Sequence, residues 1–434
     1  MKRLKAFSAA ILIIFCLTSC ASSSADSSTD DTAQTPTAAA VNMSTLNLNV
    51  IVPATGLVDQ LIACNDSGFF ETVMSTHGYA NLYYYDNESH TKRLITASDG
   101  SPFISDAVGG VSPVAANEKV FVFKRGHVPD KYVKYDGTPS YLICADADGG
   151  NRKELYLEEN QLFDSTGGVV AGGSMLYFMR HDYNLDGNGY EPTVEKTYLC
   201  RADFETGEIS ELCEFDPAPK MTVMGVWGDC IVFQSILKPP ENMTFDEYRN
   251  SISHAMYLYD VVNNSLIDAG ISWKKGEMTC TVDNSGGFYC IKAGSATLER
   301  IDLLSGETTT VCDNVSIAGE GFEASVYGMI FDSYVPVTLS ASGKDSVRLA
   351  VNIETGEISE LKLRYTDLDG WERPVTVAGE CGDCFIVICG SEYTPVTDTF
   401  ADGTVYSYEA QGYVFAAIDK ADYYDSVANY TYFE

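Results

Sequence analysis

The chain has 434 residues, with 61 Asp and Glu against 28 Lys and Arg, and a formal net charge of -33 at pH 7. Acidity of this size disfavours nucleic acids and anionic lipid surfaces as partners, because both would be repelled. With 45% hydrophobic residues, including 27 Tyr and 20 Phe, the chain does not lack material for a large core.

The first twenty residues, MKRLKAFSAAILIIFCLTSC, are typical of a signal peptide. Three basic residues precede an apolar run that is too short to span a bilayer. The last four residues resemble the bacterial lipobox, in which the cysteine becomes the lipidated first residue of the mature protein. Cys20 is therefore the predicted lipidation site, with an acyl chain such as palmitate, and an ordinary secretory signal is the alternative. No later segment approaches about 18 consecutive apolar residues, so we expect this lipid to be the only anchor, on the extracytoplasmic face of the cell membrane.

Residues 21–43 are rich in Ser, Thr, Ala and Asp and contain almost no large apolar side chain. Such a segment cannot bury enough surface to offset its ordering entropy, so it is predicted to be a flexible tether. Folded protein is expected over residues 44–434, a length that allows one large repeat domain or two to three ordinary ones.

The octapeptide ETGEISEL occurs twice, at Glu205–Leu212 and at Glu354–Leu361. Each copy follows an apolar strand that ends in Asp or Asn, and its Gly lies where a tight turn is expected. The same pattern of strand end and turn recurs along the chain. The seven expected strand ends are Asp86, Asp146, Asp203, Asp260, Asp302, Asn352 and Asp419. An Asp or Asn at this point can accept hydrogen bonds from the backbone of the turn.

Two further strand candidates, joined by a small turn, precede these hairpins, as in GVVAGGSMLYFMR before the third hairpin. Four short strands per unit, at a period of roughly 40 to 60 residues, are typical of β-propeller blades, and about 4 to 8 such units close a ring. Helix periodicity is almost absent. The sequence therefore predicts an all-β fold, a seven-bladed β-propeller of four-stranded antiparallel blades. We expect the N-terminal run STLNLNVIV to add a strand to the last blade and close the ring.

The segment CADADGGNRKELYL, at Cys144–Leu157, is similar to the Asp-rich Gly turn that follows a Tyr-Leu strand in TolB-like propellers and related bacterial lipoprotein propellers. The resemblance covers nearly everything after the tether. It implies ligand binding or envelope organisation and no particular reaction.

Long insertions single out one face of the predicted ring. They lie at residues 126–139, 181–196, 237–254 and 391–411, each between the second and third strands of a blade. Such connections share one face with the connections between blades, which we call the loop-rich face. Recognition on a rigid scaffold is usually built from long loops, so this face is the predicted binding site for a protein, peptide or glycan.

The insertion DYNLDGNGYEP spaces Asp182, Asn184 and Asp186 two apart and continues with Gly. Alternate oxygens followed by Gly are the pattern of a calcium loop, as in EF-hands and calcium-bearing propellers. The far end departs from both, because Thr193 stands where an EF-hand has Glu and Tyr190 stands where many propeller loops have Asp. Glu191 is the nearest substitute. The insertion is predicted to be either a Ca²⁺ site made by Asp182, Asn184, Asp186 and Glu191 or a solvated turn.

Trp273 and Trp371 are both expected in connections between blades, on the loop-rich face. An exposed Trp can stack on a sugar ring or anchor a protein partner, so both are candidate ligand-binding residues. The alternative is that they fill gaps between neighbouring blades.

The cysteines lie mostly singly in apolar runs, and two of the 13 belong to the signal segment. Folding the chain about the expected turns places Cys200 opposite Cys213 and Cys280 opposite Cys290. Both are predicted to be non-hydrogen-bonded pairs, where cross-strand side chains come closest. Each pair is either a disulfide or two free thiols used as small apolar residues.

Enzyme signatures are weak. The chain has no G-x-S-x-G elbow, no H-E-x-x-H and no phosphate-binding loop, and its five His show no metal-ligand spacing. No catalytic residue is predicted. The favoured function is an anchored binding protein; the alternatives are an envelope assembly scaffold, as the resemblance implies, and a glycan- or peptide-acting enzyme that uses carboxylates on the loop-rich face.

Overall fold

The computed structural model describes residues 46–52, 61–74, 78–107, 110–128, 137–164, 166–184, 193–215, 221–237, 251–399 and 405–434. The chain divides into two compact units, Met1–Ala39 and Ala40–Glu434, and the described residues all belong to the second. Cys20, the signal segment and the whole predicted tether, residues 21–43, therefore lie outside the described residues. In the described ranges, no helix combines the length and the hydropathy needed to cross a bilayer.

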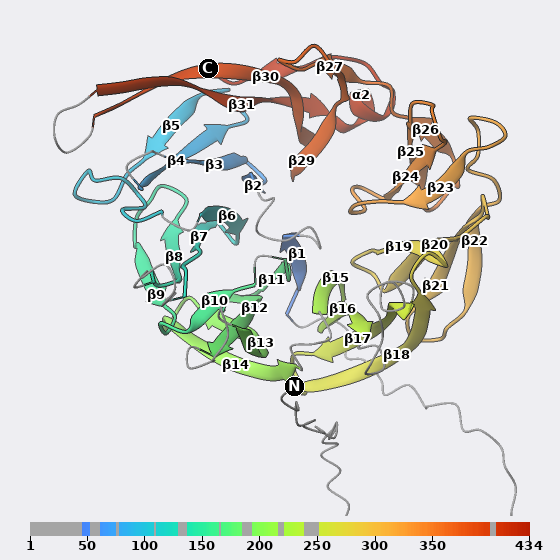
Figure 1. The fold of residues 1–434 in the computed structure, drawn as a ribbon, viewed down its shortest axis with the longest axis horizontal. Coiled ribbons are helices and arrows are strands. Elements are labelled where there is room, and N and C mark those ends of the chain that lie inside the picture. Colours follow the sequence, from blue (N-terminus) through green and yellow to red (C-terminus); the bar gives the residue numbers. More distant parts are fainter. Residues whose placement is uncertain are drawn as a thin grey trace, which may run out of the picture. The chain divides into compact units, whose positions relative to one another are not determined.

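The second unit is a seven-bladed β-propeller, as predicted (Figure 1). Each blade contains four consecutive antiparallel strands, numbered here from the axis outward. Blades 1 to 3 consist of β2 (Ile62–Asn65), β3 (Gly68–Met74), β4 (Ala80–Asp86) and β5 (Lys92–Ile95); β6 (Val111–Ala116), β7 (Lys119–Lys124), β8 (Tyr141–Asp146) and β9 (Lys153–Tyr156); and β11 (Val169–Gly172), β12 (Met175–Asn184), β13 (Thr193–Asp203) and β14 (Glu208–Phe215).

Blades 4 to 7 follow in chain order. They consist of β15 (Met221–Trp227), β16 (Cys230–Leu237), β17 (Ser253–Asp260) and β18 (Ser265–Lys274); β19 (Met278–Val282), β20 (Gly287–Lys292), β21 (Leu298–Asp302) and β22 (Thr308–Cys312); β23 (Glu323–Val326), β24 (Tyr334–Ser340), β25 (Val347–Asn352) and β26 (Ile358–Glu360); and β29 (Thr376–Cys381), β30 (Cys384–Thr399), β31 (Val405–Asp419) and β32 (Thr431–Tyr432). The remaining elements are β1 (Asn49–Val52) and β10 (Gln161–Phe163) on the blade 3 sheet, the hairpin β27 (Arg364–Thr366) and β28 (Glu372–Pro374), and α2 (Lys420–Tyr424).

The third strand of every blade ends at the predicted Asp or Asn. In five blades that side chain accepts a hydrogen bond from a backbone N–H of the following turn, and the bonds are Ser89 to Asp86 (2.8 Å), Glu205 to Asp203 (2.8 Å), Asn263 to Asp260 (2.9 Å), Ser305 to Asp302 (2.9 Å) and Glu354 to Asn352 (2.9 Å). Asp146 instead accepts from the Lys119 ammonium at 2.7 Å, and Asp419 precedes α2. The recurring residue thus forms the same turn in most blades.

The two octapeptides form equivalent outer hairpins in blades 3 and 6. Gly207 and Gly356 have φ values of 78° and 72°, and their N–H groups donate to the backbone oxygens of Asp203 and Asn352 at 2.9 Å in both cases. A positive φ at these turns is why each copy contains Gly.

Apolar side chains fill the seams between neighbouring blades. The described residues form seven buried clusters, and each cluster joins two adjacent blades around the ring. Complete burial of one such side chain contributes about 1.5–3 kcal/mol, so the seams hold the ring together.

The N-terminal strand does not close the ring, so that prediction is wrong. β1 pairs antiparallel with β11 in blade 3, and Asn49 lies opposite Ala171. Blade 7 already takes all four strands from one continuous segment, which leaves no place for β1. Alternate residues of β1 instead pack into blade 3, where Val50 and Val52 are buried.

The C-terminus bridges the first and last blades. β32 pairs with β31 of blade 7, while the Glu434 N–H donates to the His90 oxygen and the Lys92 N–H donates to the Glu434 oxygen, both at 2.9 Å. The Phe433 ring packs edge-on against Phe69 of blade 1, with the centroids 5.1 Å apart. The last four residues therefore hold blades 7 and 1 together, at a junction where neither blade takes a strand from the other end of the chain.

The two predicted cysteine pairs differ. Cys280 lies directly opposite Cys290, and the flanking backbone bonds Asp283 N–H to Gly287 O and Ala293 N–H to Glu277 O make this a non-hydrogen-bonded pair, as predicted. Cys200 lies opposite Glu211 because a register shift follows Leu199, so the prediction for Cys200 and Cys213 is wrong. All cysteines in the described ranges are free thiols.

Candidate functional site

The long connections join the second and third strands of blades 2, 3, 4 and 7, as predicted. Because successive strands of a blade are antiparallel, these connections lie on the opposite side of the ring from the tight turns between first and second and between third and fourth strands. We call the side with the tight turns the turn face. In blades 3 and 7 the insertion extends the strands, and β30 and β31 have 16 and 15 residues.

The far part of β30 and β31, Ser391–Thr399 with Val405–Tyr413, forms a two-stranded ribbon (Figure 1). Its register runs without interruption from Ser391 opposite Tyr413 to Thr399 opposite Val405. Tyr393, Val405 and Tyr413 are 51%, 61% and 50% exposed. Sequence analysis identified this segment only as an insertion, although its alternation of β-branched and aromatic residues is a strand signal.

Trp371 lies in the turn between β27 and β28, and its side chain is 66% exposed. The turn is organised by Asp367, whose carboxylate accepts the N–H groups of Asp369 at 3.0 Å and Trp371 at 2.8 Å and the Arg373 guanidinium N–H at 2.7 Å. The hydrogen bond from Arg373 is the main reason why the pKa of Asp367 is lowered. A fixed turn therefore presents an exposed indole.

The β27–β28 hairpin is tied to the base of the ribbon. The Leu368 N–H donates to the Ser391 hydroxyl at 3.1 Å, and Ser391 lies opposite Tyr413. The structure thus brings the hairpin that carries Trp371 beside the ribbon, which the sequence had shown only as an insertion.

Trp273 lies elsewhere than predicted. It belongs to the outer strand β18, opposite His254, and not to a connection between blades. The strand reaches this far because β17 begins at Ser253 and supplies pairing partners. The indole is only 7% exposed, stacks on the His254 ring with centroids 5.2 Å apart, and packs in the cluster between blades 4 and 5. The indole of Trp273 therefore offers little surface to a ligand.

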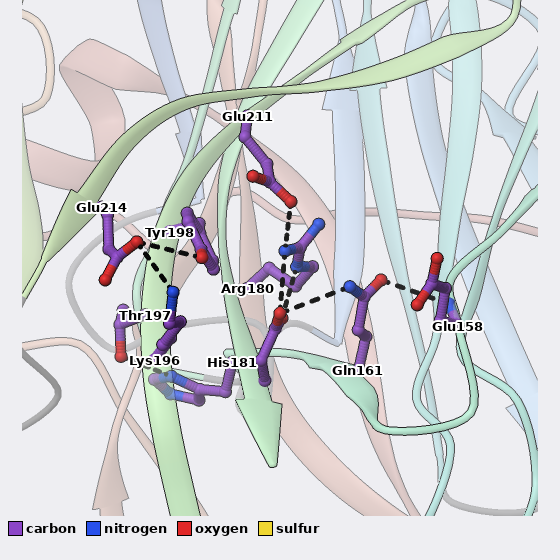
Figure 2. Close-up of polar contacts among 10 residues, drawn as sticks. Glu158, Gln161, Arg180, His181, Lys196, Thr197, Tyr198, Glu211 and Glu214 are labelled. Carbon is purple, nitrogen blue, oxygen red and sulfur yellow. Dashed lines mark hydrogen bonds and ion pairs between the residues drawn. The ribbon is translucent and has the colours of Figure 1, made fainter. Parts of the chain in front are cut away.

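The base of the acidic insertion in blade 3 is held by ion pairs (Figure 2). Arg180, 4% exposed, donates from Nε to Asp182 Oδ1 at 2.8 Å and from its terminal nitrogen to Glu211 at 2.7 Å. Gln161 Nε2 adds a longer bond of 3.4 Å to Asp182. The guanidinium also lies over the Tyr198 ring, 4.7 Å from its centroid. Each carboxylate in this network thus already has a cationic partner.

This geometry does not favour the predicted Ca²⁺ site. Asp182 is already paired with Arg180, which leaves its carboxylate less available to a metal ion. Asn184 ends β12, while Asp186 and Glu191 lie outside the described residues. In the described ranges, no group of three His, Cys, Asp or Glu side chains is arranged to hold a metal ion. Calcium binding by the whole loop stays a prediction.

A Thr-His-Asp arrangement lies beside this network. His181 contacts the Thr197 hydroxyl through Nδ1 at 2.9 Å and Asp164 through Nε2 at 3.3 Å. Burial alone would raise the pKa of Asp164, but His181 and Thr166 hold it below its usual range. Thr197 is only 4% exposed and both ring nitrogens are engaged, so a substrate has no access to the hydroxyl or to a free base. The arrangement is structural.

A cavity of about 960 Å³ lies among the inner strands. Its polar lining includes Asn117 and Asn284, which belong to turns between first and second strands, and Asn65, which ends the first strand of blade 1. The cavity therefore reaches the turn face, opposite the loop-rich face. Sequence analysis missed it, because single amides in tight turns carry no spacing signal.

No known protein family and no curated protein matches the chain. Among solved structures, a puromycin hydrolase is 13% identical with a TM-score of 0.45, over 89% of this chain and 54% of that one. TolB from Acinetobacter baumannii is 12% identical with a TM-score of 0.34, over 82% and 75%. The propeller domain of the Trilobed protease from Pyrococcus furiosus is 12% identical with a TM-score of 0.39, over 82% and 98%.

The chain spans about half the length of the puromycin hydrolase that it matches. The expected TolB-like propeller fold fits these neighbours, but likeness at this level carries no inference about function. The strands and seams described above define the class of the molecule, a seven-bladed β-propeller. Its function has to be argued from its own residues.

Proposed function

We propose that the protein is a lipid-anchored, extracytoplasmic binding protein that recognises a protein, peptide or glycan on its loop-rich face. The observation that carries this proposal is Trp371, an indole 66% exposed on a turn that Asp367 fixes. A rigid exposed aromatic loses little conformational entropy on binding and offers a face for a sugar ring or an apolar side chain. Trp273 adds no such surface, so we assign ligand contact to Trp371 alone.

The anchor rests on the sequence around Cys20. Acylation there would attach the chain to the outer leaflet of the cytoplasmic membrane, and residues 21–43 would separate the anchor from the ring. Growth with an alkyne analogue of palmitate tests this step. We expect label on the wild-type chain and none on Cys20→Ser, whereas label on both would contradict the assignment.

The scaffold and enzyme alternatives would use the same face. The described carboxylates at the base of the blade 3 insertion are paired with Arg180 or His181, so they offer a substrate neither a free acid nor a free base. We therefore place binding ahead of catalysis.

Intrinsic fluorescence tests the binding proposal, because the chain has only three Trp. Full-length protein in detergent micelles is titrated with peptidoglycan fragments, oligosaccharides and envelope-derived peptides. One of these classes should give a saturable change that Trp371→Phe abolishes and Trp273→Phe, the buried control, retains. A response equal in wild type and Trp371→Phe would show that this face does not bind through the indole.

A further inference from the structure

We infer that the cavity among the inner strands is a second ligand site, which takes a neutral oligosaccharide from the turn face. Its volume of about 960 Å³ is near the upper end of the roughly 300–1,000 Å³ found for pockets that bind small molecules. Trp371 and the ribbon belong to the loop-rich face, so this inference concerns another surface and goes beyond the proposed function.

Side-chain amides from three elements line this cavity, and each is held at one end. β1 lies on the inner side of β11 and brings Asn49 to the cavity wall (Figure 1). Asn284, in the turn between the first and second strands of blade 5, donates from Nδ2 to Asn49 Oδ1 at 3.3 Å. Asn117, in the equivalent turn of blade 2, donates from Nδ2 to the Gly173 oxygen.

The other end of each amide is available to a ligand. Among the described residues, Asn49 Nδ2 and the Oδ1 atoms of Asn117 and Asn284 have no hydrogen-bond partner. A sugar hydroxyl both donates and accepts, so it can pair with all three groups. The bonds to the protein restrict the amides before a ligand arrives, which lowers the entropy cost of binding. Donors and acceptors fixed in this way favour a ligand rich in hydroxyl groups.

An exposed aromatic ring forms another part of the cavity wall. Tyr327 lines the cavity and is 68% exposed. It lies in the connection between β23 and β24, where its N–H donates to the Pro336 oxygen at 3.2 Å. The oxygen of the next residue, Gly328, accepts from the Thr281 hydroxyl of blade 5 at 2.9 Å. The backbone that carries the ring is thus tied to two blades, and the ring offers a face on which a sugar can stack.

The charges on the wall disfavour an acidic ligand. Asp66 and Glu118 line the cavity from the turns of blades 1 and 2, and neither has a cationic partner in the described ranges. Arg348 is the one cation among the described lining residues, and its guanidinium already donates to the Val375 oxygen at 3.1 Å. An acidic sugar would therefore meet like charges, in a chain that carries -33. A neutral oligosaccharide avoids this repulsion.

The test is calorimetric titration of the full-length Trp371→Phe variant in detergent micelles, a background without the exposed indole of the loop-rich face. The probes are neutral tetrasaccharides of glucose, of mannose and of N-acetylglucosamine, with tetramers of a uronic acid and of glucosamine as charged controls. At least one neutral probe should bind with a Kd of about 1 mM or below. No binding by any neutral probe up to about 10 mM, or tighter binding by a charged tetramer, would overturn the inference.

Tyr327→Ala and Tyr393→Ala form a first matched pair of variants. Both rings are exposed, but Tyr393 lies on the ribbon of the loop-rich face. Tyr327→Ala should weaken binding of the neutral probe about tenfold, because the stacking face is lost, while Tyr327→Phe and Tyr393→Ala should stay within about twofold of the background. Thermal melting checks that each variant is folded. Equal binding by Tyr327→Ala and Tyr393→Ala would overturn the site.

Asn49→Asp and Asn314→Asp form a second pair. Asn49→Asp keeps the oxygen that accepts from Asn284 and replaces the donor nitrogen by a second oxygen. Asn314→Asp makes the same change at an exposed residue outside the cavity and keeps the oxygen that accepts the Ser316 N–H at 2.9 Å. Asn49→Asp should weaken binding about fivefold or more, and Asn314→Asp should not. Equal effects of the two changes would also overturn the site.

Failure of this inference stays distinguishable from failure of the proposed function. In a chain that keeps Trp371, the Tyr327→Ala change should leave the fluorescence response of Trp371 intact. Trp371→Phe should in turn leave the calorimetric binding of the neutral sugar intact. Loss of one response without the other therefore identifies which of the two sites is wrong.

Discussion

The two faces of the ring are made by the same strands and differ in what joins them. On the turn face, five turns repeat one device, an Asp or Asn at the end of the third strand that accepts a backbone N–H. On the loop-rich face, the ribbon, the Asp367 turn and the Arg180 network each occur once in the described ranges. Residues that recur from blade to blade thus stabilise the propeller. Residues that occur once are the candidates for ligand recognition.

The largest effect should come from the turn face. Asp283, in the turn between β19 and β20, is buried and accepts from the backbone N–H groups of Ser285 (2.7 Å) and Gly287 (2.8 Å) and from the Tyr289 hydroxyl (2.9 Å). Asp283→Ala leaves the buried donors of Gly287 and Tyr289 unpaired and should lower the free energy of unfolding by about 3 kcal/mol. Denaturant unfolding measures this loss. Ligand binding at Trp371 should persist while the variant stays folded. Loss of binding in a folded variant would contradict the conclusion that this turn of the turn face provides stability and the loop-rich face provides binding at Trp371.

The two octapeptides give a sharper comparison within the turn face. Gly207→Ala and Gly356→Ala both place alanine at a positive φ, which costs about 1–2 kcal/mol. An added Cβ at Gly356 would also come within 2.4 Å of the Val311 oxygen, whereas at Gly207 the nearest atom is Leu155 Cδ2 at 3.6 Å. Gly356→Ala should therefore be the more destabilising by about 1 kcal/mol or more. Equal unfolding midpoints would show that the backbone around Gly356 or Val311 shifts to accommodate the added Cβ.

The loop-rich face should show the reverse pattern, a small effect on stability with a large effect on binding. Asp367→Ala removes the acceptor of the Trp371 backbone N–H and frees Arg373, so the turn that carries the indole loses its fixed shape. The melting midpoint should fall less than in Asp283→Ala, while the Trp371 fluorescence response should weaken severalfold. Asp302→Ala, which alters a turn on the other face, is the matched control and should retain that response.

Short-range chemistry explains how much was predictable. All seven third-strand ends were predicted correctly, and in five of them the Asp or Asn accepts a backbone N–H of the turn that follows, which is a local interaction. The strand partner of β1 was not predicted correctly. β1 pairs with blade 3 because Val50 and Val52 become buried there, and this tertiary contact leaves no local signal in the sequence. The position of Trp273 depends on how far β17 extends. The register of Cys200 depends on a register shift between β13 and β14. Neither feature has a signature in the local sequence.

The smallest effect should follow removal of divalent cations, although a calcium site was one of the two predictions for the blade 3 insertion. Arg180 pairs with both Asp182 and Glu211 at the base of the insertion, so ion pairs hold this part of the loop-rich face. Chelator should leave the melting midpoint of the full-length protein unchanged within about 1 °C, because only a bound ion stabilises by mass action. Arg180→Met, by contrast, leaves two carboxylates without their cation and should lower the midpoint clearly. A midpoint that falls with chelator and recovers with added Ca²⁺ would instead assign a site to the loop between Asp182 and Glu191.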